Sequence, residues 1–423
     1  KVAAALNLAL SQGQQLQLVT KPTNNLPAYD AYLRGNEAAA GLFATTTNDL
    51  RQAIGFYERA VALDSTFALA WAQLARGLAY LAFTGFAPGD ARARALHAAE
   101  TSLRLEPNLA AARLALGDYY TYVGADWGKA LEQYTLGRQL APQDPDVLTG
   151  TARAQQSAGR WEESLASLRQ ASAVDPRSVP TARRLALTLL WLRRYAEAEE
   201  VADRAIALSP LAPNSLEMKA MIRLAQGDLP GAQAVIRNAR PEMDPTAKVA
   251  YFANFWDVYW PFEEADQALL LRLSPSQFDD DRMAWGIVMA EVWDLKGNRV
   301  TSLAYGDSAR VEGESRVRET EDPYLESLYA VALSYAGRHA EAVRTVEHAL
   351  KKQNSGNDAY SGAYNENLAA RIYLRAGMPD QALTILERLL TIPYHLSPGW
   401  LRIDPEWKSL RGNPRFERLI AGQ

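Results

Sequence analysis

The chain has 423 residues, a formal net charge of −4 and no cysteine. This length exceeds what one ordinary hydrophobic core organises, so we expect either roughly two to three domains or one array of repeats. A protein that wraps nucleic acid is usually basic, so that class is disfavoured, and the missing cysteines exclude disulfides, thiolate metal sites and cysteine nucleophiles. The sequence has no run of about 18 apolar residues, the length that a membrane-spanning helix needs.

Residues 1–24 are expected to form an N-terminal helix and a linker. The first twelve residues, KVAAALNLALSQ, have a helical composition and are of the kind that ends a domain lying upstream. The phrase PTNNLPAYDAYLRGNEAA at 22–39 follows, and it does not by itself form a helix pair of the repeat described next.

Residues 25–245 carry a repeat whose period can be measured between prolines. Pro107, Pro142, Pro176, Pro210 and Pro245 are spaced by 35, 34, 34 and 35 residues. Because proline cannot continue a helix, we interpret each one as the end of a unit. Small residues recur inside each unit where two helices would approach closely, and they are Ser164, Ala198 and Ala232, followed seven residues later by Ala171, Ala205 and Ala239.

Residues 246–318 are a degenerate part of the array, and residues 319–423 return to clear repeats. Aromatic residues are dense in the degenerate part, and they include Trp256, Tyr259, Trp260 and Phe262. Such residues are often core, but this density also fits a partner surface or a hinge between two arrays, and these readings stay open. Second helices are expected at 336–350 and 376–390, and the tail at 396–420 is expected to cover the last apolar face as a cap.

A 34-residue helix–turn–helix unit with this pattern resembles the tetratricopeptide repeat (TPR). Trp71, Leu74 and Ala75 also match positions in the first helix of that repeat. The resemblance implies an all-α fold, an αα-superhelix (TPR solenoid) of about ten helix–turn–helix units with a concave groove lined by the first helices. A generic helical solenoid, of the Sel1-like or pentatricopeptide kind, is the alternative.

The two ends of the chain resemble segments of one group of bacterial multidomain regulators, in which a Ser/Thr kinase, an adenylate cyclase or a TolB-like domain precedes a TPR array. The chain itself has no kinase motif, neither a Gly-rich loop with its lysine nor HRD nor DFG. The resemblance implies the interaction or sensor arm of such a regulator, in a periplasmic or extracellular location, with the cytoplasm as the alternative. The matching residues are Pro22, Thr23, Asn25, Ala28, Tyr29, Tyr32, Leu33, Arg34 and Gly35 at the front, and Leu401, Asp404, Pro405, Trp407, Leu410, Arg411, Pro414 and Phe416 at the back.

First-helix positions that face the groove of a TPR array are the candidates for partner binding. Mixed polar and cationic side chains there suit an extended peptide with acidic groups or a free carboxylate. The carboxylate clamp of chaperone-binding TPR proteins is absent, and a merely solvated groove is the alternative for each residue. The candidates are Thr149, Arg153, Gln156, Arg183, Trp191, Tyr364, Asn367 and Arg371.

The sequence offers no catalytic or metal-binding pattern. The four histidines lie far apart, and there is no P-loop, GxGxxG or GxSxG elbow. We therefore expect no enzymatic activity, no metal and no cofactor. The sequence predicts a non-catalytic scaffold with a protein or peptide partner. The alternative is a self-assembling structural subunit, for example of an extracellular filament, that associates through Trp256, Tyr259, Trp260 and Phe262.

Overall fold

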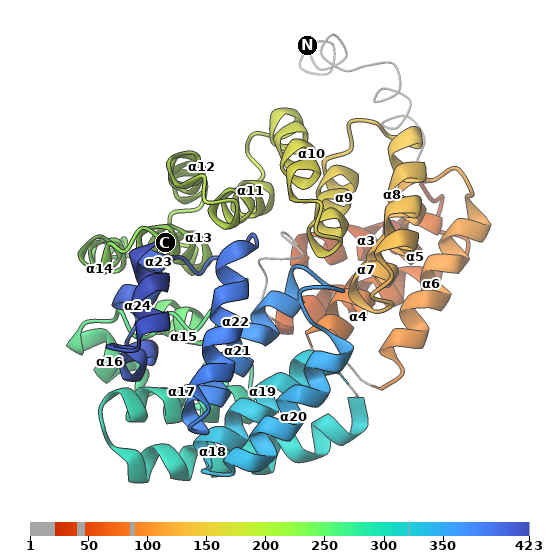
Figure 1. Ribbon diagram of the computed structural model, residues 1–423. Coiled ribbons are helices and arrows are strands. Elements are labelled where there is room, and N and C mark those ends of the chain that lie inside the picture. Colours follow the sequence, from red (N-terminus) through yellow and green to blue (C-terminus); the bar gives the residue numbers. More distant parts are fainter. Residues whose placement is uncertain (1–21, 40–46, 85–88, 321, 423) are drawn as a thin grey trace. The chain divides into compact units, whose positions relative to one another are not determined.

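The computed structural model describes residues 22–39, 47–84, 89–320 and 322–422, and all regular structure in these ranges is helical (Figure 1). The helix expected within residues 1–12 lies outside the described ranges. The chain divides into two compact units, residues 1–142 and 143–423, and each has its own hydrophobic core. Ten consecutive helix pairs follow one another in the described residues, so the expected all-α fold of about ten helix–turn–helix units is confirmed.

Unit 1 contains three helix pairs, in which each first helix packs against the helix that follows it. Glycine allows the closest of these contacts. A Cβ on Gly117 would lie 2.5 Å from the ring of Tyr134, and Gly35 and Tyr57 repeat the arrangement. The helices are α3 (Leu26–Ala38), α4 (Thr47–Leu63), α5 (Ala68–Phe83), α6 (Ala91–Leu105), α7 (Ala110–Tyr122) and α8 (Trp127–Leu140).

A buried polar network joins the second and third pairs of unit 1. The hydroxyl of Tyr134 donates to the carboxylate of Asp118 at 2.8 Å, and Arg76 from α5 pairs with the same carboxylate at 2.9 Å. Buried polar groups cost stability unless they are partnered, and here each group partners the others. The network therefore fixes how α5, α7 and α8 sit against one another.

Unit 2 contains seven helix pairs and a C-terminal tail. The seven pairs are α9 (Pro145–Ser157) with α10 (Trp161–Val174), α11 (Val179–Trp191) with α12 (Tyr195–Leu208), α13 (Pro213–Ala225) with α14 (Leu229–Arg237), α15 (Pro245–Asn254) with α16 (Glu264–Leu270), α17 (Arg282–Leu295) with α18 (Arg299–Thr320), α19 (Pro323–Tyr335) with α20 (His339–Lys352), and α21 (Ser361–Arg375) with α22 (Pro379–Thr391). The short helix η1 (Pro275–Phe278) precedes α17, and the tail forms α23 (Pro398–Ile403), η2 (Pro405–Leu410) and α24 (Pro414–Ala421).

The turns between paired helices use left-handed residues, as helix C-termini commonly do. Glycine fills this position in five of the pairs in unit 2, with φ between 74° and 79°, and Arg193 fills it between α11 and α12 with φ 58°. The prolines behave as expected with one exception. Pro107, Pro142, Pro176 and Pro210 each follow a helix end, whereas Pro245 is the first residue of α15. The last interval of the proline spacing, from Pro210 to Pro245, therefore runs from a helix end to a helix start.

The last helices of unit 2 return to its first helices. The amide of Ala359 donates to the carbonyl of Ser157 at 2.9 Å, and Arg193 donates to the carbonyl of Leu390 at 2.8 Å. Helix α23 packs on α13, where a Cβ on Gly399 would lie 2.8 Å from the amide nitrogen of a residue in the α13–α14 turn. The side of the array that was expected to form an open groove is therefore enclosed by unit 2 itself.

Candidate functional site

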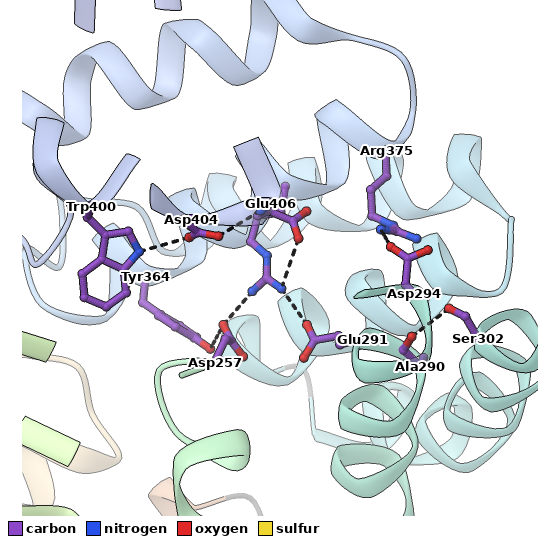
Figure 2. Close-up of polar contacts among 11 residues, drawn as sticks. Asp257, Ala290, Glu291, Asp294, Ser302, Tyr364, Arg375, Trp400, Asp404 and Glu406 are labelled. Carbon is purple, nitrogen blue, oxygen red and sulfur yellow. Dashed lines mark hydrogen bonds and ion pairs between the residues drawn. The ribbon is translucent and has the colours of Figure 1, made fainter. Parts of the chain in front are cut away.

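The centre of the candidate site is Arg371, a guanidinium whose side chain is only 9% exposed. It donates to Asp257 at 2.6 Å and to Glu291 at 2.7 Å, and Glu406 lies 3.9 Å away. These carboxylates come from three separate segments of unit 2, and Figure 2 shows them converging. The hydroxyl of Tyr364 also donates to Asp257, at 3.1 Å.

Helix α21 supplies one wall through side chains four residues apart. Asn367, Arg371 and Arg375 lie on one face because such spacing repeats after about one helical turn. Arg375 donates to Asp294 at 2.8 Å, and its guanidinium lies 3.7 Å from the ring centre of Tyr335. These three polar side chains line the cavity together with the apolar Leu374 of the same helix.

The loop after α15 supplies a second wall through an uncommon backbone. Trp256 and Asp257 both have φ 56°. Non-glycine residues in this region each carry a strain on the order of 1–3 kcal/mol, and such residues gather at functional sites. The conformation directs the Asp257 carboxylate to Arg371 and packs Trp256 against Tyr364 and His395, with ring centres 5.5 Å apart in both cases.

The tail supplies the third wall. Trp400 donates from its indole nitrogen to Asp404 at 3.0 Å, and the backbone amide of Glu406 donates to the same carboxylate at 2.9 Å. Asp404 also caps η2, which begins at Pro405, because an aspartate followed by proline is a strong helix-starting pair. The Asp404 cap thus places Glu406 and Trp407 beside Arg371.

The walls line a partly open cavity of about 410 Å³. Several polar atoms of buried side chains in these walls have no hydrogen-bond partner among the described residues, although buried polar atoms in proteins are nearly always paired. They are Oε2 of Glu291, Oδ1 of Asn367, Nε of Arg375, Nδ1 of His395 and Nε1 of Trp407.

The electrostatics of the cavity are set by burial and by crowded acids. Burial raises the pKa of Glu291 to about 8, against the opposing effect of Arg371 and with the support of Asp257 and Glu406. Burial also raises the pKa of Asp404 to about 6 and lowers that of His395 to about 3, so the histidine is neutral. Burial disfavours the charge on Arg371, but the neighbouring carboxylates outweigh it and raise its pKa well above the usual value. The lining holds five acidic side chains against three basic ones, and its raised pKa leaves Glu291 largely protonated at neutral pH.

Most of the sequence-predicted groove residues are enclosed in unit 2. Thr149, Arg153, Gln156, Trp191, Asn367 and Arg371 are buried, and Arg183 and Tyr364 are partly buried. Asn367 and Arg371 line the cavity.

Three other members of that set join separate segments of unit 2. Gln156 donates to Thr188 at 2.7 Å, which ties α9 to α11, and Arg183 donates to Tyr251 at 3.4 Å. The indole of Trp191 stacks on Tyr360 with ring centres 5.0 Å apart. These contacts occupy the inner face that an open array would offer to a partner.

The aromatic residues considered for self-association also lie inside unit 2. Tyr259 and Phe262 are buried, and Trp256 and Trp260 are partly buried in the cavity wall. Little of their surface is available to a second copy of the chain, so nothing in their placement favours a filament.

Sequence reasoning missed the acids that face Arg371. Asp257 comes from a loop and Glu406 from the short helix η2, and neither segment is long enough for a periodicity to mark an inward side chain. Glu291 did carry a signal, because it is a carboxylate within the otherwise apolar stretch MAWGIVMAEVW. A charged residue on an apolar helix is rarely buried without a partner.

Neither a membrane-spanning helix nor a metal site is present in the described ranges. No helix in them is long and apolar enough to cross a membrane. No group of three or more acidic or histidine side chains there is arranged to hold a metal ion.

The sequence model of the tetratricopeptide repeat matches residues 367–397. This stretch covers most of α21, all of α22 and the segment that precedes α23, so it includes the wall formed by Asn367, Arg371 and Arg375. The predicted TPR resemblance is confirmed there, and repeats of this kind generally mediate protein–protein interactions. No curated protein matches the chain in sequence.

Solved structures with similar helical repeats include PilW, a type IV pilus biogenesis factor, at 17% identity, covering 59% of this chain and 100% of PilW with a TM-score of 0.40. A tetratricopeptide repeat protein from Parabacteroides merdae is 12% identical, covers 73% of this chain and 98% of its own, and has a TM-score of 0.30. YrrB, a TPR protein with an unusual peptide-binding site, is 19% identical over 49% of this chain and 98% of its own, with a TM-score of 0.29. None of these three is a kinase or a cyclase, and similarities this remote carry no argument about function.

Proposed function

We propose that the chain is a non-catalytic scaffold that binds an extended segment of a protein partner, and that the cavity of unit 2 is its recognition site. The observation that carries this proposal is the set of unpartnered polar atoms in the cavity walls. Leaving such an atom buried and unpaired costs about 1–3 kcal/mol, so a ligand that pairs them recovers free energy on binding.

The surroundings of the cavity favour a peptide over a compact small molecule. A shallow depression of about 520 Å³ adjoins the cavity and shares Trp260, Leu295 and Pro405 with it. The depression is also lined by Leu229, Ile403, Gln267 and Lys296. One side chain of an extended peptide can thus enter the cavity while its neighbours lie across the depression.

The tail links this site to the conformation of unit 2, as a sensor or interaction role in a larger bacterial regulator would require. Trp400 and Asp404 line the cavity, and the helix that carries Trp400 packs on α13. A partner that binds the cavity therefore contacts the segment that closes unit 2 on itself. Binding shifts unit 2 towards the closed arrangement by the difference between the partner's binding free energies for the closed and open arrangements. In this way a local contact can change the conformation of the whole unit.

Selection of binders from a random-peptide display library tests the proposal, with the intact chain as bait. We expect selected peptides to bind the Trp260→Ala variant at least tenfold more weakly, because Trp260 belongs to both the cavity and the depression. Trp127→Ala in unit 1 is the matched control and should leave binding unchanged, with circular dichroism confirming that both variants are folded. Selection of no peptide above background, or equal binding to both variants, would contradict the proposal.

A further inference from the structure

We infer that the group the cavity takes from its partner is a cation, the guanidinium of an arginine side chain. The inference rests on the proposed function in one respect, which is that the guanidinium comes from a protein segment. The chemistry of the bound group can be tested separately. This cationic ligand differs from the acidic peptide expected from the sequence. The sequence pattern identified the basic residues at the groove positions but not the carboxylates that face them.

The two arginines that α21 contributes to the cavity are already neutralised. Arg371 donates to both Asp257 and Glu291, and Arg375 donates to Asp294 while lying over the ring of Tyr335. An anionic ligand would have to displace these carboxylates or lie beside them, and like charges in a poorly solvated site repel strongly. The wall is therefore a poor receptor for an acidic group.

Acceptor oxygens remain available to a cation. The one ion pair of Glu406 among the described residues is its 3.9 Å approach to Arg371, which is too long for a hydrogen bond. Oδ1 of Asn367, an amide oxygen, has no partner in the same residues. A planar guanidinium has five donors in a fixed fork, which suits several acceptors on one side of a cavity.

Aromatic rings complete the environment that a guanidinium prefers. Trp256, Tyr259, Trp260 and Trp400 all line the cavity, and the rings of Trp260 and Trp400 are 6.2 Å apart at 71° to each other. The face of an indole attracts a cation, and a flat, weakly hydrated guanidinium stacks on it better than an ammonium does. This ordering predicts a preference for arginine over lysine.

Two unpartnered donors fit the peptide that carries such a side chain. Nε1 of Trp407 and Nε of Arg375 are N–H groups without an acceptor in the described residues. A peptide carbonyl accepts hydrogen bonds but donates none, so the two groups suit the backbone on either side of the inserted residue. Acceptors for the cation and donors for the backbone are thus both present.

Calorimetric titration of the intact chain with four blocked amino acids tests the inference. The probes are the N-acetyl amides of L-arginine, L-lysine, L-citrulline and L-glutamate, of which citrulline matches arginine in shape but is neutral. We expect arginine to bind best, lysine more weakly, and citrulline and glutamate at least tenfold more weakly than arginine. Citrulline binding as tightly as arginine, or glutamate binding best, would overturn the inference.

A matched pair of variants locates the binding. Glu406→Gln should weaken arginine-probe binding about tenfold, because it keeps the shape of a side chain that makes no close ion pair and removes its charge. Glu163→Gln, on the exposed face of α10, should have no effect. Equal binding to Glu406→Gln and to the unchanged chain would place the arginine elsewhere and end the inference.

The outcomes separate this inference from the proposed function. The scaffold would be retained and the cation site refuted by two results together: the selected peptides depend on Trp260 but lack a basic residue, and the arginine probe does not bind. An arginine probe that binds through Glu406, without any selected peptide, would retain the cation site and refute the peptide partner. Failure of both would refute both.

Discussion

Individual residues show how strongly the interior of each unit constrains its sequence. In unit 1, the absent side chain of Gly117 is what allows the ring of Tyr134 to pack against α7. In unit 2, one guanidinium compensates several buried acids, and its loss would leave them facing one another. Both cases concern residues whose neighbours cannot easily move away.

Replacing Gly117 by alanine should destabilise unit 1 by about 2 kcal/mol, because overpacking a fitted interior forces neighbours off their preferred geometry. Tyr134 cannot yield freely, since its hydroxyl is bonded to Asp118. The matched control is Gly55→Ala in α4, where a Cβ meets nothing within 4 Å. That change should stabilise by about 0.5–1 kcal/mol, because alanine has the higher helix propensity. Denaturant unfolding of both variants measures the two effects, and a shift of the same sign for both would contradict this account of the Gly117 contact.

Replacing Arg371 by methionine should destabilise unit 2 by about 3 kcal/mol, because removing one partner of a buried ion pair leaves the other charge uncompensated. The control is Arg169→Met, which removes an exposed pair with Glu197 and should change stability by less than about 0.5 kcal/mol. Thermal unfolding followed by circular dichroism compares the two. Equal stability of the Arg371→Met variant and the unchanged chain would mean that the carboxylates are already solvated in the folded chain and do not need Arg371.

Helix pairs are the elements that the sequence predicted best. Prolines after helix ends and glycines in the turns mark the pairs, because each follows from a local backbone preference. The array therefore appears in the sequence as a regular pattern, and the all-α fold was predicted from it. The elements that build the candidate site were less visible, since the loop carrying Asp257 and the short helix η2 follow no helical period.

The closure of unit 2 could not be predicted from these local patterns. Arg193 and Leu390 are joined by a hydrogen bond across 197 positions in the chain, and the hydroxyl of Ser397 donates to the carbonyl of Ala225 across 172. No periodicity encodes which distant repeats meet, and a groove open to solvent was the natural expectation for stacked pairs. The same long-range contacts explain why residues expected to face a partner instead face one another.

Closure between α23 and α13 should depend on Gly399. A Cβ there would lie 3.0 Å from the carbonyl oxygen of Ala225 and 2.8 Å from the amide nitrogen of Gly227. Because these are backbone atoms, they cannot rotate away, and we expect Gly399→Ala to weaken the contact by about 1–3 kcal/mol. Hydrogen exchange read by mass spectrometry should then quicken in α23 and α13, while Gly55→Ala leaves both unchanged. Unaltered protection in α23 would show that this contact does not hold the tail.

At the scale of the whole molecule, two separate cores support different kinds of surface. Unit 1 is a short stack of three pairs, and unit 2 is a longer array that encloses a charged and aromatic cavity. Stability in stacked repeats is close to a sum of neighbouring interfaces, so substitutions in one unit should leave the other unit's core intact. The function we propose belongs to unit 2, because that is where polar atoms remain unpaired inside a defined space.

The most direct test of this account is a crystal structure of the chain grown with N-acetyl-L-arginine amide. The account predicts the guanidinium in the cavity, within about 3 Å of the Glu406 carboxylate and stacked on an indole of the lining. Arginine bound at any other place, or a cavity filled by rearranged side chains of the chain itself, would contradict it.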